Sequence, residues 1–94
     1  MKFKIGKSKY KLLEKENLEL ENTIGLCKYV EKEIHIKKLL NNKLKKATLI
    51  HELTHAFMFE NAHTRESFTQ EDICDLFGAY AEDVVNYANK YFGD

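Results

Sequence analysis

The feature that most constrains the fold is a change in the spacing of apolar residues near residue 41. In residues 1–40 apolar and charged side chains largely alternate, so that Phe3 and Ile5 share one face of a strand. From residue 42 onward the apolar residues recur at the spacing of an α-helix. One such change in 94 residues predicts a single α+β domain, with a small, mostly antiparallel sheet packed on two helices.

The first forty residues are expected to supply the strands of this domain. The alternation predicts four of them, at residues 2–5, 9–13, 24–30 and 33–37. A turn is expected at residues 31–32, and Gly25 lies where a strand begins or bulges. Residues 14–23 fit either a turn of helix or an alternating strand, and both interpretations stay open.

The first predicted helix spans residues 42–60. Asn41 or Asn42 is an acceptable N-cap for it. Its apolar residues cover much of its circumference, so we expect a central helix rather than one that lies on the surface.

The second predicted helix spans residues 69–92. Thr69 is the expected N-cap, Asp72 completes a variant of the capping box, and Gly93 ends the helix. One stripe of this helix consists mostly of small residues, namely Cys74, Gly78, Ala81, Val85 and Ala88. Such a stripe would allow the first helix to approach closely.

The composition excludes several classes of protein. With 44% apolar and 32% charged residues, the chain is expected to be neither disordered nor embedded in a membrane. No apolar run approaches the ~18 residues of a spanning helix. The basic N-terminus lacks an apolar signal-peptide core, so we expect a cytoplasmic protein with Cys27 and Cys74 reduced.

A net charge of zero conceals an uneven distribution of charge along the chain. Residues 1–50 carry 13 lysines and 6 acidic residues, whereas residues 51–94 carry 2 basic and 9 acidic residues. The lysines of the first half alternate with glutamates, which favours a solvated surface over a nucleic-acid interface. We therefore expect no nucleic-acid partner and no membrane partner, and we expect a cation in the acidic half.

The most informative motif is His-Glu-Leu-Thr-His at residues 51–55, inside the first predicted helix. Residues four apart on a helix lie about 40° apart around its axis, so His51 and His55 can bind one cation. Neutral imidazole suits zinc. Glu52 lies about 100° round from His51, where it can approach the open side of the metal as a general base for bound water.

A catalytic zinc site needs a third protein ligand and an open coordination position. The residues alone leave six candidates for that ligand: His63, Glu66, Glu71, Asp72, Asp75 and Glu82. An ordinary polar patch is the alternative to a metal site. It is disfavoured because two histidines and a glutamate on a buried helix need a partner.

Residues 51–57, followed after a gap by residues 70–78, resemble thermolysin-type peptidases, whose second helix carries a similar run of glutamate, aspartate and Phe-Gly. This resemblance implies that Glu71 is the third zinc ligand and that Asp75 holds a ligand histidine by a hydrogen bond. The chain also resembles small ImmA/IrrE-like and phage-encoded metallopeptidases, in which a Gly-x-Cys element such as residues 25–27 precedes the HExxH helix. The implied assignment is a minimal gluzincin with a zincin-like core.

The chain departs from these families in two respects. The loop between the two motifs is slightly shorter, and there is no separate C-terminal domain of the kind that stabilises the oxyanion in larger gluzincins. His63 is the best candidate for that role, ahead of Arg65 and Tyr80, and an ordinary surface histidine is the alternative for it. His35 alternates away from its two isoleucine neighbours, which predicts an exposed position on a strand.

The leading interpretation is a zinc metallopeptidase in which Glu52 takes a proton from zinc-bound water, and the hydroxide attacks a peptide carbonyl. Its substrate would be a peptide or protein, which a strand edge beside the site could bind in extended form. The alternatives are a non-catalytic, zinc-stabilised interaction module and a subunit that is active only with a partner. The sequence leaves the oligomeric state open.

Overall fold

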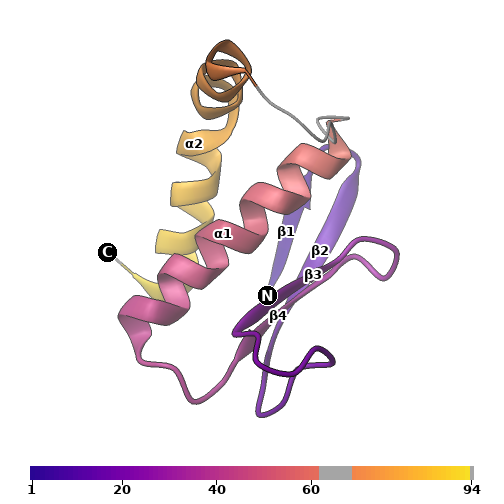
Figure 1. The fold of residues 1–94 in the computed structure, drawn as a ribbon, viewed down its shortest axis with the longest axis vertical. Helices are drawn as coiled ribbons and strands as arrows, with labels where there is room; N and C mark the ends of the chain where they lie inside the picture. Colours follow the sequence, from indigo (N-terminus) through magenta and orange to yellow (C-terminus); the bar gives the residue numbers. More distant parts are fainter. Residues whose placement is uncertain (62–68, 94) are drawn as a thin grey trace.

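The computed structural model describes residues 1–61 and 69–93 as a four-stranded sheet with two helices on one face (Figure 1). The elements in chain order are β1 (Lys2–Ile5), β2 (Ser8–Lys15), β3 (Gly25–Lys28), β4 (Glu33–Lys37), α1 (Asn42–Glu60) and α2 (Gln70–Phe92). The predictions of an α+β fold and of two helices are confirmed. Neither of the described helices is long and apolar enough to span a bilayer.

The strands are ordered β1-β2-β4-β3 across the sheet. The two outer pairs, β1 with β2 and β3 with β4, are antiparallel, but the central pair, β2 with β4, is parallel. The sheet is therefore mixed, and the expectation of a mostly antiparallel sheet is corrected. A parallel pair needs a connection that carries the chain back along the sheet, and residues 16–32, which include β3, provide it.

The segment between β2 and β3 is neither of the two structures that its sequence left open. Residues 16–24 form turns and bends, and Asn22 adopts a left-handed conformation with φ of 65°. The third strand is shorter than predicted, because the chain already turns over residues 29–32. In that turn Lys32 has φ of 61°.

The hydrophobic core lies between the sheet and the helices. Alternate residues of the central strands, including Tyr10, Leu12, Ile34 and Ile36, are buried in one cluster with Leu53 of α1. A single cluster of this kind accounts for the position of α1, which packs on the sheet by one side.

The prediction that α1 is central is wrong, because another side of this helix is exposed. The exposed residues are Asn42, Lys43, Leu44, Ala47, His51, His55 and Phe59. The sheet covers one side of α1 and α2 covers an adjacent side, and no third layer of the described chain covers the rest. The two motif histidines are accessible as a result.

The second helix begins and ends where the sequence predicts. The Thr69 hydroxyl accepts a hydrogen bond from the backbone N–H of Asp72, and the Asp72 carboxylate accepts one from the backbone N–H of Thr69. Gly93 is the C-cap, with φ of 79°.

The helix does not pack through its small-residue stripe as expected. Three members of the stripe are exposed, namely Cys74, Gly78 and Val85. The buried residues are Val84 and Ala88, and the rings of Tyr80 and Tyr87 beside them pack at a tilt against Phe57 of α1. The large rings fill the space between the helices, so the small residues of the first turns face away from α1.

The C-terminal end of α1 is fixed to both hairpins of the sheet by Glu60. Its carboxylate accepts hydrogen bonds from Ser8, from Tyr10 and from Lys32. Burial raises the pKa of Glu60, but the three donors outweigh that effect, and the pKa lies below its ordinary value. This contact holds α1 at a set position over the sheet.

Candidate metal centre

His51 and His55 lie one turn apart on the exposed side of α1, and their rings converge. Their Nε2 atoms are 3.2 Å apart and their ring centroids are 4.9 Å apart. Two imidazole nitrogens bound to one tetrahedral zinc ion, each at about 2.0–2.1 Å, lie roughly 3.3 Å from each other. The donor atoms and their separation therefore fit a shared zinc ion.

Glu52 occupies a different side of α1, next to β3. It is 8% exposed, and its carboxylate has no hydrogen-bond partner among the described residues. Burial raises the pKa of Glu52, and the nearby His51 and His55 offset this only in part. A carboxylate of raised pKa is suited to taking up a proton near neutral pH.

Gly25 lies against this glutamate at the start of β3. A Cβ atom built on Gly25 would be 2.5 Å from Cγ2 of Thr48 and 3.0 Å from Oε2 of Glu52. Contacts of that length do not occur with real Cβ atoms, so only glycine fits here. The sequence marked Gly25 as a strand start or bulge, and the structure shows that close approach of α1 requires it.

The variant Gly25→Ala is expected to unfold more readily than the wild type, by about 1–3 kcal/mol, because the added methyl overpacks Thr48 and displaces Glu52. Urea denaturation followed by circular dichroism measures the difference. Gly78→Ala is the matched control, since nothing lies within 4 Å of its added Cβ. It should gain roughly 0.5–1 kcal/mol from helix propensity. Equal losses in the two variants would contradict the packing argument.

A groove opens beside this part of α1. Its volume is about 450 Å³, and it is lined by His51 and Glu52, by Gly25 and by the segment 22–24 before β3, together with Leu44, Ala47 and Thr48 of α1. Because β3 is an edge strand, no strand of the described chain pairs with the outer edge of its backbone beside this groove. The carboxylate of Glu52, the His51 imidazole and an edge strand thus adjoin one opening.

The thiol of Cys27 is half-buried on β3 and contributes no anionic ligand at neutral pH. Burial, followed by the charges of Glu52 and Glu60, raises its pKa to about 12. The thiol therefore stays protonated near the candidate site.

The structure does not bring a third ligand to the histidine pair. Among residues 1–61 and 69–93, no group of three or more His, Cys, Asp or Glu side chains could hold a metal ion. Glu71 and Asp75 are exposed on the first turns of α2, and Asp72 forms the capping box. His63, the candidate for oxyanion stabilisation, and Glu66 lie outside the described residues.

His35 is buried rather than exposed, contrary to the prediction. It is 1% exposed, its Nε2 contacts Glu33 at 2.9 Å, and its Nδ1 has no partner among the described residues. It does alternate away from the core, but Leu13 and Leu26 flank it on the neighbouring strands. The alternation of residues correctly placed His35 on the face of the sheet away from the core. It did not predict that the two leucines on neighbouring strands would bury it.

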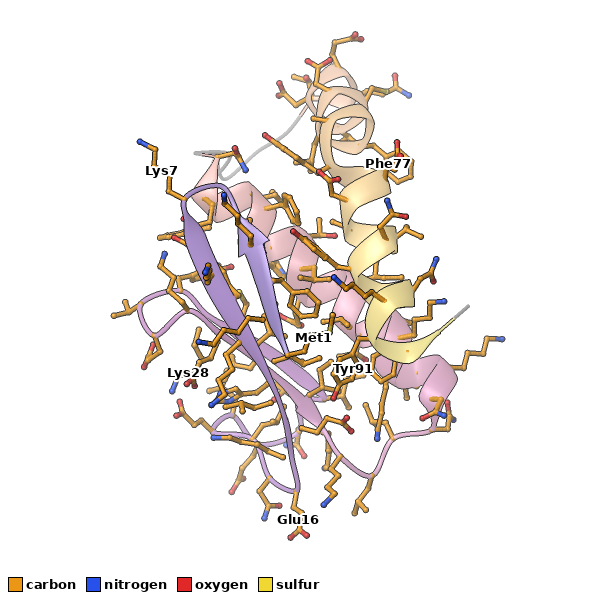
Figure 2. The ribbon with its side chains drawn as sticks, turned by 180° about the vertical axis from the view of Figure 1, so that it is seen from behind. Met1, Lys7, Glu16, Lys28, Phe77 and Tyr91 are labelled. Carbon is orange, nitrogen blue, oxygen red and sulfur yellow. The ribbon has the colours of Figure 1, made fainter. Side chains whose placement is uncertain are left out.

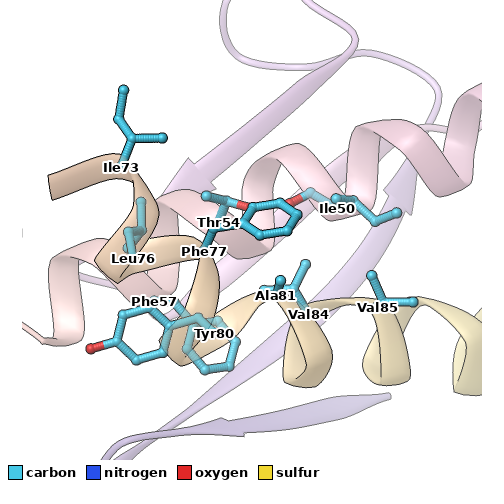
Figure 3. A pocket seen from close by; sticks show the side chains of 10 residues that line it. All are labelled: Ile50, Thr54, Phe57, Ile73, Leu76, Phe77, Tyr80, Ala81, Val84 and Val85. Atoms are coloured by element: carbon cyan, nitrogen blue, oxygen red, sulfur yellow. The ribbon is translucent and has the colours of Figure 1, made fainter. Parts of the chain in front are cut away.

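An apolar pocket of about 140 Å³ lies between α1 and α2 (Figure 3). Ile50, Thr54 and Phe57 of α1 line it together with Ile73, Phe77 and other apolar residues of α2. Neither the two motif histidines nor Glu52 line this pocket. It is therefore separate from the groove beside Glu52.

No protein-family model, no curated protein and no solved structure matches this chain. The comparisons identify no family for it. The functional argument accordingly depends on the geometry of α1 and β3.

Proposed function

We propose that this protein is a zinc-dependent peptidase. The observation that carries the proposal is the convergence of the two imidazole Nε2 atoms, 3.2 Å apart, beside a buried carboxylate with no described partner. The Glu52 side chain is largely buried, but it lines the groove, so its carboxylate is placed where a bound group could reach it.

His51 and His55 would hold the zinc ion, with Glu71 as the proposed third ligand and Asp75 as the residue that orients a histidine ring. Zinc, when bound, polarises a carbonyl oxygen and acidifies water. The side chains around it are neutral imidazoles and a carboxylate, a combination of donors common in catalytic zinc sites.

Glu52 would act as the proton carrier. Its Oε atoms lie at the groove, where they can take a proton from the attacking water and then deliver it to the leaving nitrogen of the peptide. The raised pKa of Glu52 supports the first step, because burial makes the carboxylate a stronger base than an exposed glutamate.

The proposed substrate is an extended peptide bound along β3. The outer edge of this strand offers backbone N–H and C=O groups, so a peptide could add to the sheet there and pass the mouth of the groove. A cleavage screen with a peptide library, comparing wild type with Glu52→Gln, tests the activity directly.

A non-catalytic, zinc-stabilised module is the second candidate. A structural zinc site needs four protein ligands, so this candidate requires ligands from outside the described residues, which form no complete three-ligand group. The same observation would fit a subunit whose site is completed by a partner. Cleavage by the isolated chain would exclude both alternatives.

Zinc titration of variants of α2 tests the proposed third ligand. Glu71→Ala should weaken zinc binding severely, whereas Asp75→Ala should weaken it by the roughly 10–100-fold typical of residues that orient a ligand. Competition with a chromophoric chelator measures both affinities. Glu82→Ala, another exposed acid on α2, is the control and should bind zinc as the wild type does. If Asp75→Ala is the more damaging change, the assignment of Glu71 is wrong.

A further inference from the structure

The paired part of the hairpin of β1 and β2 carries four lysines on one face. Phe3, Ile5, Tyr10 and Leu12 point into the core, so the alternate positions point away from the helices. Those positions are all exposed and are occupied by Lys2, Lys4, Lys9 and Lys11, which we call the basic face. Figure 2 views the molecule from this side, with Lys7 at the turn of the hairpin.

The register of the hairpin sets these lysines against one another. Lys2 is opposite Lys11, and Lys4 is opposite Lys9. Like charges directly across two strands are destabilising. None of the four has a carboxylate partner among the described residues, although Lys28, Lys32 and Lys45 each have one.

The glutamates of the first half of the chain do not neutralise the basic face. Glu14 points to the helices, where it binds Lys45 and Tyr91. Glu19 and Glu31 both contact Lys28 on β3. Glu33 of β4 lies opposite Lys11 on the outward face, where it contacts His35. One glutamate therefore borders the four lysines, and the alternation seen in the sequence is not repeated between Lys2, Lys4 and Lys9.

The chemistry of the basic face suits a regular polyanion. Lysines two apart on a strand are about 6.6–6.8 Å apart, which gives a flat and evenly spaced array of ammonium groups. The four outward positions of the basic face carry only lysine, and the one apolar residue on this side of the hairpin is Leu13, further along β2 beside His35. The face therefore lacks the apolar centre typical of a protein interface and the groups that insert into a bilayer. It also lacks rings for stacking on bases.

We propose that the basic face binds the phosphate backbone of nucleic acid without regard to sequence. This departs from the expectation of no nucleic-acid partner, which the mixed charge of the sequence had suggested. The hairpin is at the opposite edge of the sheet from β3, and its basic face points away from α1. Binding there leaves the groove beside Glu52 open.

Fluorescence anisotropy with a labelled 20-base-pair duplex of random sequence tests the proposal. Four phosphate contacts predict a slope of log K against log salt of about −3.6, and hence an affinity roughly 100-fold lower at 200 mM than at 50 mM salt. The double variant Lys4→Gln/Lys9→Gln should bind more weakly, with a slope closer to zero by about 2. Its melting temperature at low salt should not fall, because a like-charge pair has been removed.

The control is Lys43→Gln/Lys90→Gln, which removes two exposed lysines from the helices and should leave both affinity and slope unchanged. Equal weakening in the two double variants would overturn the proposal, as would the absence of duplex binding at 50 mM salt. Binding to phosphatidylcholine vesicles containing phosphatidylserine, without binding to the duplex, would show a membrane surface as the partner instead.

Discussion

Purified protein is expected to hold about one zinc ion per chain, and both His51→Ala and His55→Ala are expected to lose it. The two Nε2 atoms converge at 3.2 Å, so each substitution removes half of the only imidazole pair that α1 presents. Elemental analysis of protein dialysed against a weak chelator measures the metal content. Removal of zinc should also lower the melting temperature, because the free energy of metal binding stabilises the folded state.

A matched control distinguishes loss of a ligand from general damage to the helix. Lys43→Ala also alters the exposed side of α1, but it lies two turns before His51 and should keep its zinc. The histidine rings are exposed and outside the hydrophobic core, so the metal-free variants should remain folded. Wild-type zinc content in both histidine variants would remove the metal centre from consideration.

Glu52→Gln is expected to keep zinc and the fold while lowering the rate of peptide hydrolysis about 10²–10⁴-fold, the usual contribution of a general base. Glutamine has nearly the same shape, but it cannot take up a proton. The measurement is kcat/KM on any peptide found in the library screen. A variant that cleaves at the wild-type rate would contradict the role of Glu52 and favour the interaction module.

The same variant has a second, independent readout in its stability. Burial raises the pKa of Glu52 in the folded state, so its ionisation opposes folding as the pH rises above about 4.3, the ordinary pKa of glutamate. The metal-free Glu52→Gln protein should therefore melt at a higher temperature than wild type at pH 7. The difference should fade as the pH is lowered, because below the unfolded pKa both states carry a neutral Glu52. A less stable variant at pH 7 would mean that the carboxylate supports the fold.

The sequence predicted the structure correctly where a feature depends on residues that are close together in the chain. The capping box of Thr69 and Asp72 and the one-turn spacing of His51 and His55 depend only on neighbours within four residues. Helical geometry converts such spacings directly into positions in space. The helices and the proximity of the two motif histidines are therefore predictable from the sequence alone.

The errors have a common cause, which is dependence on distant contacts. The parallel pairing of β2 with β4 is set by the path of residues 16–32, and no local pattern encodes it. The burial of His35 requires its flanking leucines from two other strands. Which side of α2 faces α1 depends on the tyrosines that fill the interface, whereas the small residues only permit a close approach.

The parallel pairing at the centre of the sheet also constrains how the chain can assemble. Each outer pair is a hairpin closed by a short turn, so each can form from its own residues. The strands β2 and β4 are not consecutive in the chain. Their parallel pairing therefore depends on contacts between the two hairpins and forms after them. Only residues 38–41 separate β4 from the helix that bears the motif. Loss of this pairing would therefore detach the β1-β2 hairpin from the rest of the fold, including the contacts of Ser8 and Tyr10 with Glu60 of α1. Both walls of the groove, α1 and the start of β3, lie on the β4 side of the pairing.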